Sequence, residues 1–257
     1  MNRCSSFLSN KRSSALTFAG FDPSGGAGVL ADCRVFEAFG FYGMAVVTAF
    51  TVQGPRSVES VLGVPDGLIL RSAGALAEQA AIAAVKIGML FDAHTVREVA
   101  QSIDLFKTAP VVLDPVIEAS DGTRLIDDDG IEAMKEALIG KVDAITPNVP
   151  EAERLTGLKI EDEASAFKAA EKLLELGAGC AVIKGGHLNG DPVDFLAASG
   201  LRRSYRTQRI TGPQVHGTGC AFSSALAALL GQGCDVQAAV PRVKEFVLEI
   251  IKQKAGI

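Results

Sequence analysis

The stretch ALTFAGFDPSGGAGVLAD, residues 15–32, joins a short apolar run to a glycine-rich turn and the start of a helical pattern. The run ALTFAGF (15–21) is typical of a buried strand. The glycines that follow it allow a tight turn and a close approach of the backbone to a neighbour. Beyond the turn, apolar residues recur at the spacing of one helix face: Ala31, Val35, Ala38 and Phe39. This strand, turn and helix predict an α/β protein.

The same alternation continues along the chain. Further apolar runs bounded by Gly, Pro or Asp cover residues 44–50, 84–89, 111–116, 142–148 and 181–186. A second helix face is marked by Ala166, Ala169, Ala170, Leu173 and Gly177. Residues 193–197 and 201–206 have the pattern of a hairpin that ends in an edge strand. Alternating strands and helices predict a mostly parallel sheet with helices on both faces.

Polar residues follow three of the predicted strands at their carboxyl ends. Asp114 and Pro115 end one run, residues 146–148 (Thr-Pro-Asn) end the next, and residues 184–186 (Lys-Gly-Gly) end a third. Ligands of open α/β sheets bind at the carboxyl ends of the strands. We therefore expect these three clusters to form one site at a single edge of the sheet.

Composition limits the class of protein. A chain of 257 residues with a net charge of −5 has no basic field for nucleic acid, so any phosphate needs a local site. Five cysteines without C-x-x-C spacing argue against a disulfide framework or structural zinc and favour the cytoplasm. The longest apolar stretch contains charged residues, so we expect no membrane span. We expect a loose tail over residues 1–14 and a single domain over 15–257.

The segment HGTGC (216–220) precedes an apolar helical pattern. Gly217 and Gly219 leave the first-turn amides of that helix unobstructed, and the helix dipole adds positive potential, which together predict an anion hole. The same field predicts that the pKa of Cys220 lies below the free value of about 8.5, near that of a general base. The alternative is that Cys220 is a small buried apolar residue, which is our interpretation of Cys33, Cys180 and Cys234.

The segment TPNVPEAERLTG (146–157) offers Asn148 and Glu151, an amide and a carboxylate three residues apart. Oxygen ligands of this kind suit Mg²⁺, although Asn148 and Glu151 also fit a helix capping box. Asp114 adds a second carboxylate, and Lys184 adds a cation for a transferring phosphoryl group. Together with the anion hole and Cys220, these residues describe phosphoryl transfer from a nucleotide to a hydroxyl.

The glycine-rich turn after the first strand has three interpretations. It lacks the G-x-G-x-x-G spacing of a dinucleotide site and the G-x-x-x-x-G-K-[ST] of a P-loop. It could be a plain structural turn. We favour a small-molecule pocket, because Asp32 lies in an otherwise apolar helix face where a carboxylate without a partner is costly.

Six segments together resemble the hydroxymethylpyrimidine kinases of thiamine synthesis, which are members of the ribokinase-like superfamily. They are GFDPSGGAGVLAD, KIGM, DPV, TPNVPEAERLTG, KGGH and HGTGC, between residues 15 and 232. The resemblance implies a ribokinase-like three-layer α/β/α sandwich, and a homodimer. It also implies phosphorylation by ATP and Mg²⁺ of 4-amino-5-hydroxymethyl-2-methylpyrimidine and then of its monophosphate.

Carried over to this chain, the resemblance assigns roles to individual residues. Gly217, Gly219 and Cys220 match the family's anion hole and catalytic position, and Asp114, Asn148, Glu151 and Lys184 become the ATP-binding set, with Asp114 and Glu151 at the metal. The pyrimidine pocket is matched by Gly20, Ala27, Asp32, Gln53 and Met89. Asp32 and Gln53 would hydrogen-bond the edge of the aminopyrimidine.

Three features depart from the family pattern. The family's A-K-S-G after D-P-V is here A-S-D-G, so that Ser120 and Asp121 replace the lysine and the serine and a cation near the phosphates is missing. The family's N-T-H before G-T-G-C is here Gln214, Val215 and His216. The charged tail after Gly233 is short, so we do not expect the extra domain that is fused to some relatives.

These departures leave two other functions open. Pyridoxal or pyridoxine kinase has the same fold and a similar ring substrate that carries a hydroxymethyl group. The other function is that of a pyrimidine-binding relative whose catalysis is impaired.

Overall fold

The computed structural model describes residues 13–54, 57–187, 190–210 and 216–255. Nine strands in these residues form one sheet, in the order β3-β2-β1-β4-β5-β6-β7-β8-β9. Neighbours from β2 to β7 are parallel, whereas β3, β8 and β9 pair antiparallel at the two edges. The strands are β1 (Ser14–Phe21), β2 (Tyr42–Gln53), β3 (Val58–Gly63), β4 (Ile82–Ile87), β5 (Val111–Leu113), β6 (Ala144–Ile145), β7 (Cys180–Ile183), β8 (Val193–Ala198) and β9 (Leu201–Arg206).

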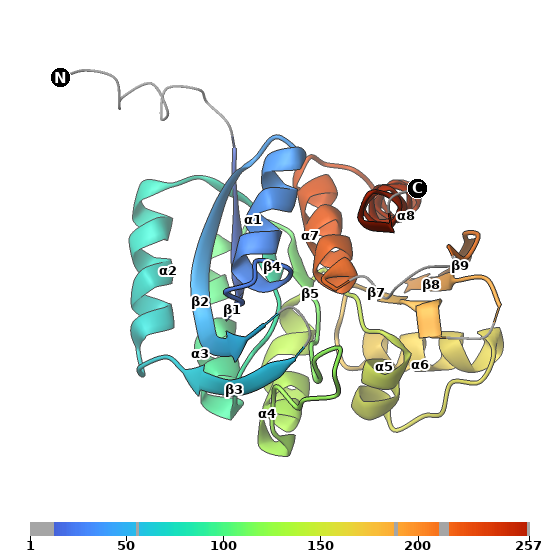
Figure 1. Ribbon diagram of the computed structural model, residues 1–257, viewed down its shortest axis with the longest axis horizontal. Coiled ribbons are helices and arrows are strands. Elements are labelled where there is room, and N and C mark those ends of the chain that lie inside the picture. Colours follow the sequence, from blue (N-terminus) through green and yellow to red (C-terminus); the bar gives the residue numbers. More distant parts are fainter. Residues whose placement is uncertain (1–12, 55–56, 188–189, 211–215, 256–257) are drawn as a thin grey trace.

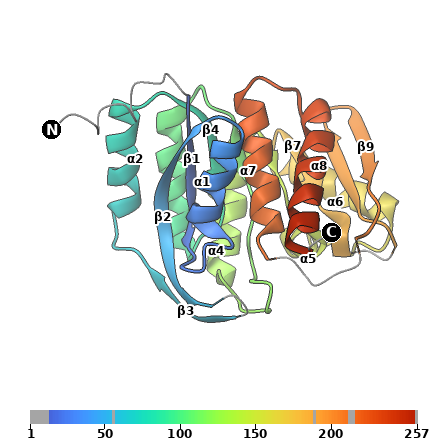
Figure 2. The same ribbon diagram turned by 45° about the horizontal axis from the view of Figure 1, so that its top comes forward.

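Helices cover both faces of the sheet (Figures 1 and 2). On one face lie α1 (Gly28–Ala38), α7 (Thr218–Gly231) and α8 (Val236–Ala255). The other face carries α2 (Leu68–Gln79), α3 (Ala93–Ser102), α4 (Asp128–Ala133), α5 (Val149–Thr156) and α6 (Glu163–Glu175). Short 3₁₀ turns cover Ile103–Phe106, Ile139–Lys141 and Gly185–His187, and a π turn covers Met134–Leu138. The predicted three-layer α/β/α sandwich with a mostly parallel sheet is confirmed.

The sheet separates two apolar layers because alternate residues of a strand face opposite sides. In β1, Leu16 and Phe18 pack on the side of α2 to α6, whereas Ala15 packs on the side of α1, α7 and α8. Helix α7 is buried from Ala221 to Leu229, since it lies between α1, α8 and the sheet. Its alanines permit this close packing, which fixes the position of its N-terminus.

Two glycines allow close backbone contacts, one within the β1–α1 turn and one between this turn and the start of α7. Gly28 has φ +62°, and a Cβ there would lie 2.2 Å from the carbonyl oxygen of Gly20. Gly217 has φ +87°, and a Cβ there would lie 1.9 Å from the carbonyl oxygen of Gly26. A side chain at Gly28 would distort the β1–α1 turn, and one at Gly217 would push this turn and the start of α7 apart.

The predicted strands are present, but two of them end early. The run 111–116 leaves the sheet after Leu113, and the run 142–148 forms only Ala144–Ile145. Their remaining residues turn towards the site at the carboxyl edge of the sheet. The hairpin of β8 and β9 is confirmed, whereas the antiparallel edge strand β3 was not predicted.

Other expectations concern the chain as a whole. The expected tail reached residue 14, but β1 already begins at Ser14, and residues 1–12 lie outside the described part. In the part of the chain that the structure describes, no helix is long and apolar enough to cross a membrane. The four cysteines described, Cys33, Cys180, Cys220 and Cys234, are all free.

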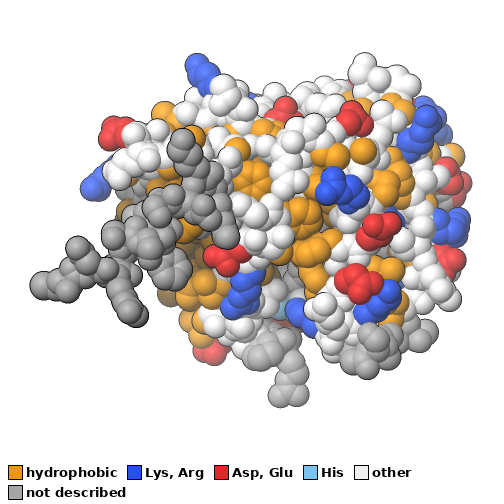
Figure 3. Space-filling view, turned by 90° about the horizontal axis from the view of Figure 1, so that it is seen from above, with side chains coloured by type: hydrophobic (Ala, Val, Ile, Leu, Met, Phe, Trp, Pro, Cys, Tyr) orange, Lys and Arg blue, Asp and Glu red, His pale blue; other side chains and the backbone are white. Residues whose placement is uncertain are grey.

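The face that carries α1, α7 and α8 shows acidic and basic side chains interspersed, without a continuous basic patch on its described atoms (Figure 3). This distribution agrees with the net charge of −5. A phosphate group therefore has to be bound by local geometry rather than by a broad positive field.

Candidate active site

A cavity of about 1,080 Å³ opens at the carboxyl ends of the parallel strands. Its walls come from the β1–α1 turn, the end of β2, the loops after β4 to β7, the first turn of α7 and the inner side of α8. Strand order explains the convergence, because β1, β4, β5, β6 and β7 are parallel neighbours whose carboxyl ends share one edge. The three polar clusters predicted to meet at this edge do meet there.

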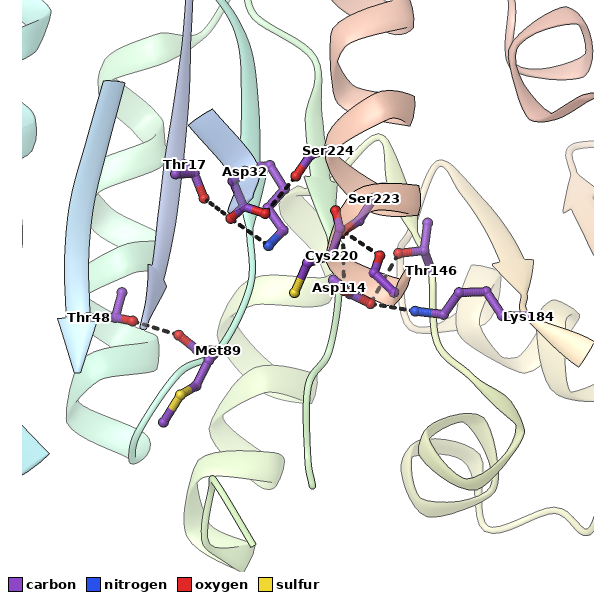
Figure 4. Close-up of polar contacts among 12 residues, drawn as sticks. Thr17, Asp32, Thr48, Met89, Asp114, Thr146, Lys184, Cys220, Ser223 and Ser224 are labelled. Carbon is purple, nitrogen blue, oxygen red and sulfur yellow. Dashed lines mark hydrogen bonds and ion pairs between the residues drawn. The ribbon is translucent and has the colours of Figure 1, made fainter. Parts of the chain in front are cut away.

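The centre of the cavity holds an ion pair between the loops after β5 and β7. Lys184 Nζ lies 2.7 Å from Asp114 Oδ1. The other carboxylate oxygen of Asp114 accepts a hydrogen bond from Ser223 Oγ of α7 at 3.1 Å. Only 15% of the Lys184 side chain and 2% of the Asp114 side chain are exposed (Figure 4). Burial lowers and Asp114 raises the pKa of Lys184, with a net rise, so this lysine is a permanent cation.

The first turn of α7 faces this ion pair. Gly217 is the N-cap and supplies no side-chain cap, so no N-cap side chain competes with an anion for the first-turn amides. Gly219 also borders the ion pair, since a Cβ there would lie 3.4 Å from Lys184 Nζ and 3.8 Å from Asp114 Oδ2. The structure therefore brings together Gly217, Gly219, Lys184 and Asp114, as predicted.

Cys220 lines the same cavity, but its predicted low pKa is wrong. Burial raises the pKa of the thiol above its usual value, and Asp32 and Asp114 act in the same direction. Lys86 and the backbone amide of Gly28 oppose them without reversing the shift. The loss of water around the sulfur therefore has a larger effect than the charge of Lys86 and the Gly28 amide.

Asn148 and Glu151 form the capping box of α5. Asn148 Oδ1 accepts from the Glu151 amide at 2.9 Å, and Glu151 Oε2 accepts from the Asn148 amide at 2.7 Å. Both residues still line the cavity, so the capping role and a role in the site coexist. Burial raises the pKa of Glu151 to about 7, with Asp114 acting in the same direction and Lys184 opposing it.

The carboxylates of Asp114 and Glu151 were predicted to contact a metal. Within the described residues, no group of three or more His, Cys, Asp or Glu is arranged to hold one. Mg²⁺ needs only one or two carboxylates, together with water and substrate phosphates, so the two residues suit it chemically. Because both already accept hydrogen bonds from the protein, they fit contacts made through the water ligands of Mg²⁺ better than direct ones.

Four of the residues expected to bind the substrate ring lie on one wall of the cavity: Gly20, Ala27, Gln53 and Met89. The Met89 sulfur packs on Gly20, where a Cβ would lie only 2.7 Å from it. The backbone of Met89 is held by Thr48, whose hydroxyl donates to the Met89 carbonyl at 2.6 Å. An apolar wall beside the amide of Gln53 suits an aromatic ring with polar edge groups.

Asp32 is not on this wall, so the geometry does not support its predicted contact with the substrate. The side chain is completely buried, and its carboxylate accepts hydrogen bonds from Thr17, Lys86 and Ser224 at 2.7–2.8 Å. Its partners are therefore all from the protein. A carboxylate in an apolar helix face requires a partner, and for Asp32 that partner is Lys86 of the protein itself.

His216 and Asp22 also line the cavity, although no role was predicted for Asp22 and the role of His216 was left open. His216 Nε2 lies 3.3 Å from both Gln53 Nε2 and Asp22 Oδ2. Asp22 accepts from the amides of Ser24 and Ala27, and these bonds, with His216, hold its pKa below the usual value although burial works to raise it. The D-P-S turn is the sequence signal for such a residue.

The segment that departs from the family pattern lies across the cavity from α7. Ser120 lines the cavity, whereas Asp121 binds the amides of Val58 and Thr123 and ties the segment to the start of β3. Cations do occur on this wall, because Arg124 and Arg154 line it and both pair with Asp128. The departure before G-T-G-C covers residues 214–216. Of these only His216 is described, since Gln214 and Val215 lie outside the described residues.

One end of the cavity is apolar and was not predicted from the sequence. It is lined by Phe222, Val247, Leu248 and Ile251 from α7 and α8. Lys244 of α8 and Asp194 of β8 also line the cavity and pair at 2.7 Å, and Asp194 accepts from the Gly185 amide at 3.1 Å. The amphipathic pattern of α8 carries the signal, but nothing in the sequence indicates which element its apolar face meets.

Comparisons with known proteins agree with this geometry. Residues 22–257 match the family model described as phosphomethylpyrimidine kinase. The chain is 41% identical to the hydroxymethylpyrimidine/phosphomethylpyrimidine kinase of Aquifex aeolicus, over 93% of this chain and 94% of that one. It is 40% identical to the thiamine biosynthesis bifunctional protein ThiED of Geobacter sulfurreducens, over 94% of this chain but only 49% of that protein.

Solved structures have the same fold. The phosphomethylpyrimidine kinase from Clostridium difficile 630 superposes with a TM-score of 0.83 at 34% identity, covering 94% of this chain and all of that one. An ADP complex of Bacillus subtilis pyridoxal kinase superposes with a TM-score of 0.84 at 31% identity, covering 91% and 90%. The ribokinase-like fold is thus shared by a phosphomethylpyrimidine kinase and a pyridoxal kinase.

Proposed function

The chain belongs to the phosphomethylpyrimidine kinase family, and from that premise we propose that it phosphorylates 4-amino-5-hydroxymethyl-2-methylpyrimidine and then the resulting monophosphate. The enzyme is a kinase, and we propose ATP as its phosphate donor. The observation that carries the proposal is the position of the α7 N-terminus, which faces the Lys184–Asp114 pair in the same cavity as the ring-binding wall.

Each part of the cavity supports one part of the reaction. The wall of Gly20, Ala27, Gln53 and Met89 suits the pyrimidine ring, and the apolar end beside α8 suits the adenine base. Between them, the first-turn amides of α7 and Lys184 suit the phosphates, because amides and a fixed cation stabilise the charge on a transferring phosphoryl group.

Cys220 is our candidate for the group that takes the proton from the substrate hydroxyl. It lies in the turn that would hold the phosphoryl group. As the hydroxyl oxygen attacks the γ-phosphorus of ATP, its proton passes to the sulfur and the bond to ADP breaks. Mg²⁺, when bound, neutralises charge on the phosphates, and Asp114 and Glu151 would face its water ligands.

An assay of the purified protein with MgATP tests the proposal. The hydroxymethylpyrimidine, its monophosphate and pyridoxine are supplied separately, and the phosphorylated products are separated by chromatography. We expect turnover of both pyrimidines. Binding of the pyrimidine without turnover of ATP would instead indicate the impaired relative that the sequence left open.

Pyridoxal kinase is the second candidate, and one observation favours it. The B. subtilis pyridoxal kinase superposes on this chain as well as the C. difficile phosphomethylpyrimidine kinase does. Pyridoxine phosphorylated with a higher kcat/KM than the pyrimidine would reverse the order of the two candidates.

We also propose that the protein is a homodimer that acts in the cytoplasm. Apolar side chains on the edge of the sheet support the dimer, because Phe50 and Leu62 pair across β2 and β3 and are 45% and 57% exposed. Val52, 45% exposed, follows on the same face of β2. Large apolar residues clustered at an exposed edge are typical of a surface that another copy covers.

A further inference from the structure

A buried ion pair lies beside the cavity, and the reaction described above does not use it. Lys86 Nζ is 2.8 Å from Asp32 Oδ2, and neither side chain is exposed. Asp32 also accepts from Thr17 and Ser224, each at 2.7 Å. Moving two ions out of water is so costly that an apolar pair of the same volume often stabilises a fold equally well. Stability alone does not account for this pair.

The two charges of the pair lie differently relative to the cavity. Lys86 lies on the cavity wall, whereas the described residues that form the wall do not include Asp32. Gly88 makes room for the ammonium, since a Cβ there would lie 2.5 Å from Lys86 Nζ. The positive end of the pair therefore faces the cavity, and the negative end is held behind it by two hydroxyl groups.

The positive end faces the first turn of α7. Ser224, which binds Asp32, is four residues after Cys220, so both side chains lie on the same side of the helix. Figure 4 shows the Cys220 sulfur beside the Asp32 cluster. Lys86 lowers the pKa of the Cys220 thiol more than Asp32 raises it, so the pair as a whole favours the thiolate.

Other groups around Cys220 do not provide this effect. Asp114, after β5, raises the pKa of the thiol. The Gly28 amide of α1 lowers it, but less than Lys86 does. Lys184, after β7, also interacts with Cys220, but it is not among the groups with the largest effect on the pKa of the thiol. Lys86 is thus the main charge that opposes the effect of burial on the sulfur.

We propose that the Lys86–Asp32 pair is a positioning element of the reaction, which holds a fixed positive charge beside Cys220 and stabilises the thiolate that accepts the substrate proton. Asp32 keeps Lys86 charged and oriented, and Ser224 fixes α7 relative to the pair. The inference rests on the proposed function, in which Cys220 takes the proton of the hydroxyl.

The test measures the titration of the thiol rather than catalysis. Alkylation of Cys220 by iodoacetamide is followed from pH 6 to 11, without substrate or Mg²⁺, by mass spectrometry of the peptide that contains it. The variant is Lys86→Met with Asp32→Asn, because removing both charges leaves no unpaired ion in the core. We expect the midpoint to rise by about one pH unit or more, with an about tenfold slower reaction at pH 8. An unchanged midpoint in the folded variant overturns the proposal.

The matched control is Lys244→Met with Asp194→Asn, which removes another buried ion pair, of 2.7 Å. We expect it to leave the Cys220 midpoint where it is in the unaltered protein. If the control raises the midpoint as much, the effect reflects general loosening and the proposal is wrong. Thermal unfolding verifies that both variants are folded.

Failure of this inference and failure of the proposed function are distinguishable. The alkylation profile requires neither ATP nor the pyrimidine, so it reports on the pair even if the protein phosphorylates another substrate. A protein that phosphorylates the pyrimidine and loses activity in Cys220→Ala, but whose thiol titration ignores the Lys86–Asp32 pair, overturns the inference alone.

Discussion

The Cys220 thiol is subject to opposing effects, with burial raising its pKa and nearby donors lowering it. Removal of the sulfur should therefore affect proton transfer more than binding. We expect Cys220→Ala to lower kcat by about 10²–10⁴ and to change KM little. Because the thiol titrates above its usual range, the activity of the unaltered enzyme should rise with pH, and this rise should be absent in the variant. Steady-state kinetics from pH 6 to 10 measure both, and full activity would make Cys220 a packing residue.

Glu151 is a buried carboxyl whose pKa is raised from 4.5 to about 7. Between these values the folded protein holds a proton that the unfolded chain has released, so stability falls as pH rises through this window. Glu151→Gln keeps a side chain that can complete the capping box but carries no charge. We expect the variant to be more stable than the unaltered protein above pH 7, by on the order of 2 kcal/mol, and equal to it near pH 4.5. Urea unfolding at several pH values measures this, and parallel pH profiles would contradict it.

At the scale of single residues, the sequence identifies groups that need partners but not the partners. Asp32 is recognisable as a carboxylate in an apolar helix face, yet Lys86 follows 54 positions later and Ser224 follows 192 positions later. The predicted low pKa of Cys220 fails for a related reason. A helix N-terminus is visible in the sequence, whereas the burial that outweighs it depends on the packing of distant segments.

At the scale of elements, the two glycines at the start of α7 have different tasks. Gly217 has φ +87° and contacts the β1–α1 turn, so Gly217→Ala should lower the free energy of unfolding by about 1–3 kcal/mol. Gly219 has helical geometry, and a methyl group there would make only ordinary contacts with Lys184 and Asp114. Gly219→Ala should fold normally but lower kcat/KM at least tenfold, because the methyl group enters the phosphate space. Chemical unfolding and steady-state kinetics of the two variants measure the difference. Equal destabilisation by the two substitutions would refute the prediction.

Elements were predictable where local signals are strong. Apolar runs bounded by Gly, Pro or Asp identify the parallel strands, because buried strands need continuous apolar residues. The ends of β5 and β6 were less clear, since Asp114 and residues 146–148 follow the apolar residues without a break and leave the sheet only to form the site. Strand β3 has exposed residues on an edge and therefore lacks the apolar signal.

At the scale of the whole molecule, the edge of β2 and β3 is where we expect a second copy to bind. Leu62→Lys would place a charge in that interface and should shift the protein towards monomer. The control is Leu105→Lys, since Leu105 is 46% exposed in the turn after α3. Light scattering coupled to size exclusion measures the mass of each. A dimer that persists in Leu62→Lys, or a monomer in the unaltered protein, would contradict the expectation.

The overall architecture followed from the sequence because alternation of strands and helices allows few arrangements of a parallel sheet. The convergence of Asp114, Asn148 and Lys184 followed from the same rule. The features that were missed depend on contacts between segments that lie far apart in the sequence. The apolar end of the cavity needs α8, and the β1–α1 turn needs His216, 194 positions after Asp22.

Ser223 and Ser224 are consecutive, yet they bind two carboxylates, Asp114 and Asp32, that come from different parts of the sheet and its helices. Neighbouring helical residues differ by about 100° in direction. Inserting or deleting one residue between Gly219 and Ser223 would therefore swing both hydroxyls away from their acceptors at once. These two hydrogen bonds therefore fix the rotation of helix α7 about its axis. They also fix the number of residues between Gly219 and Ser223.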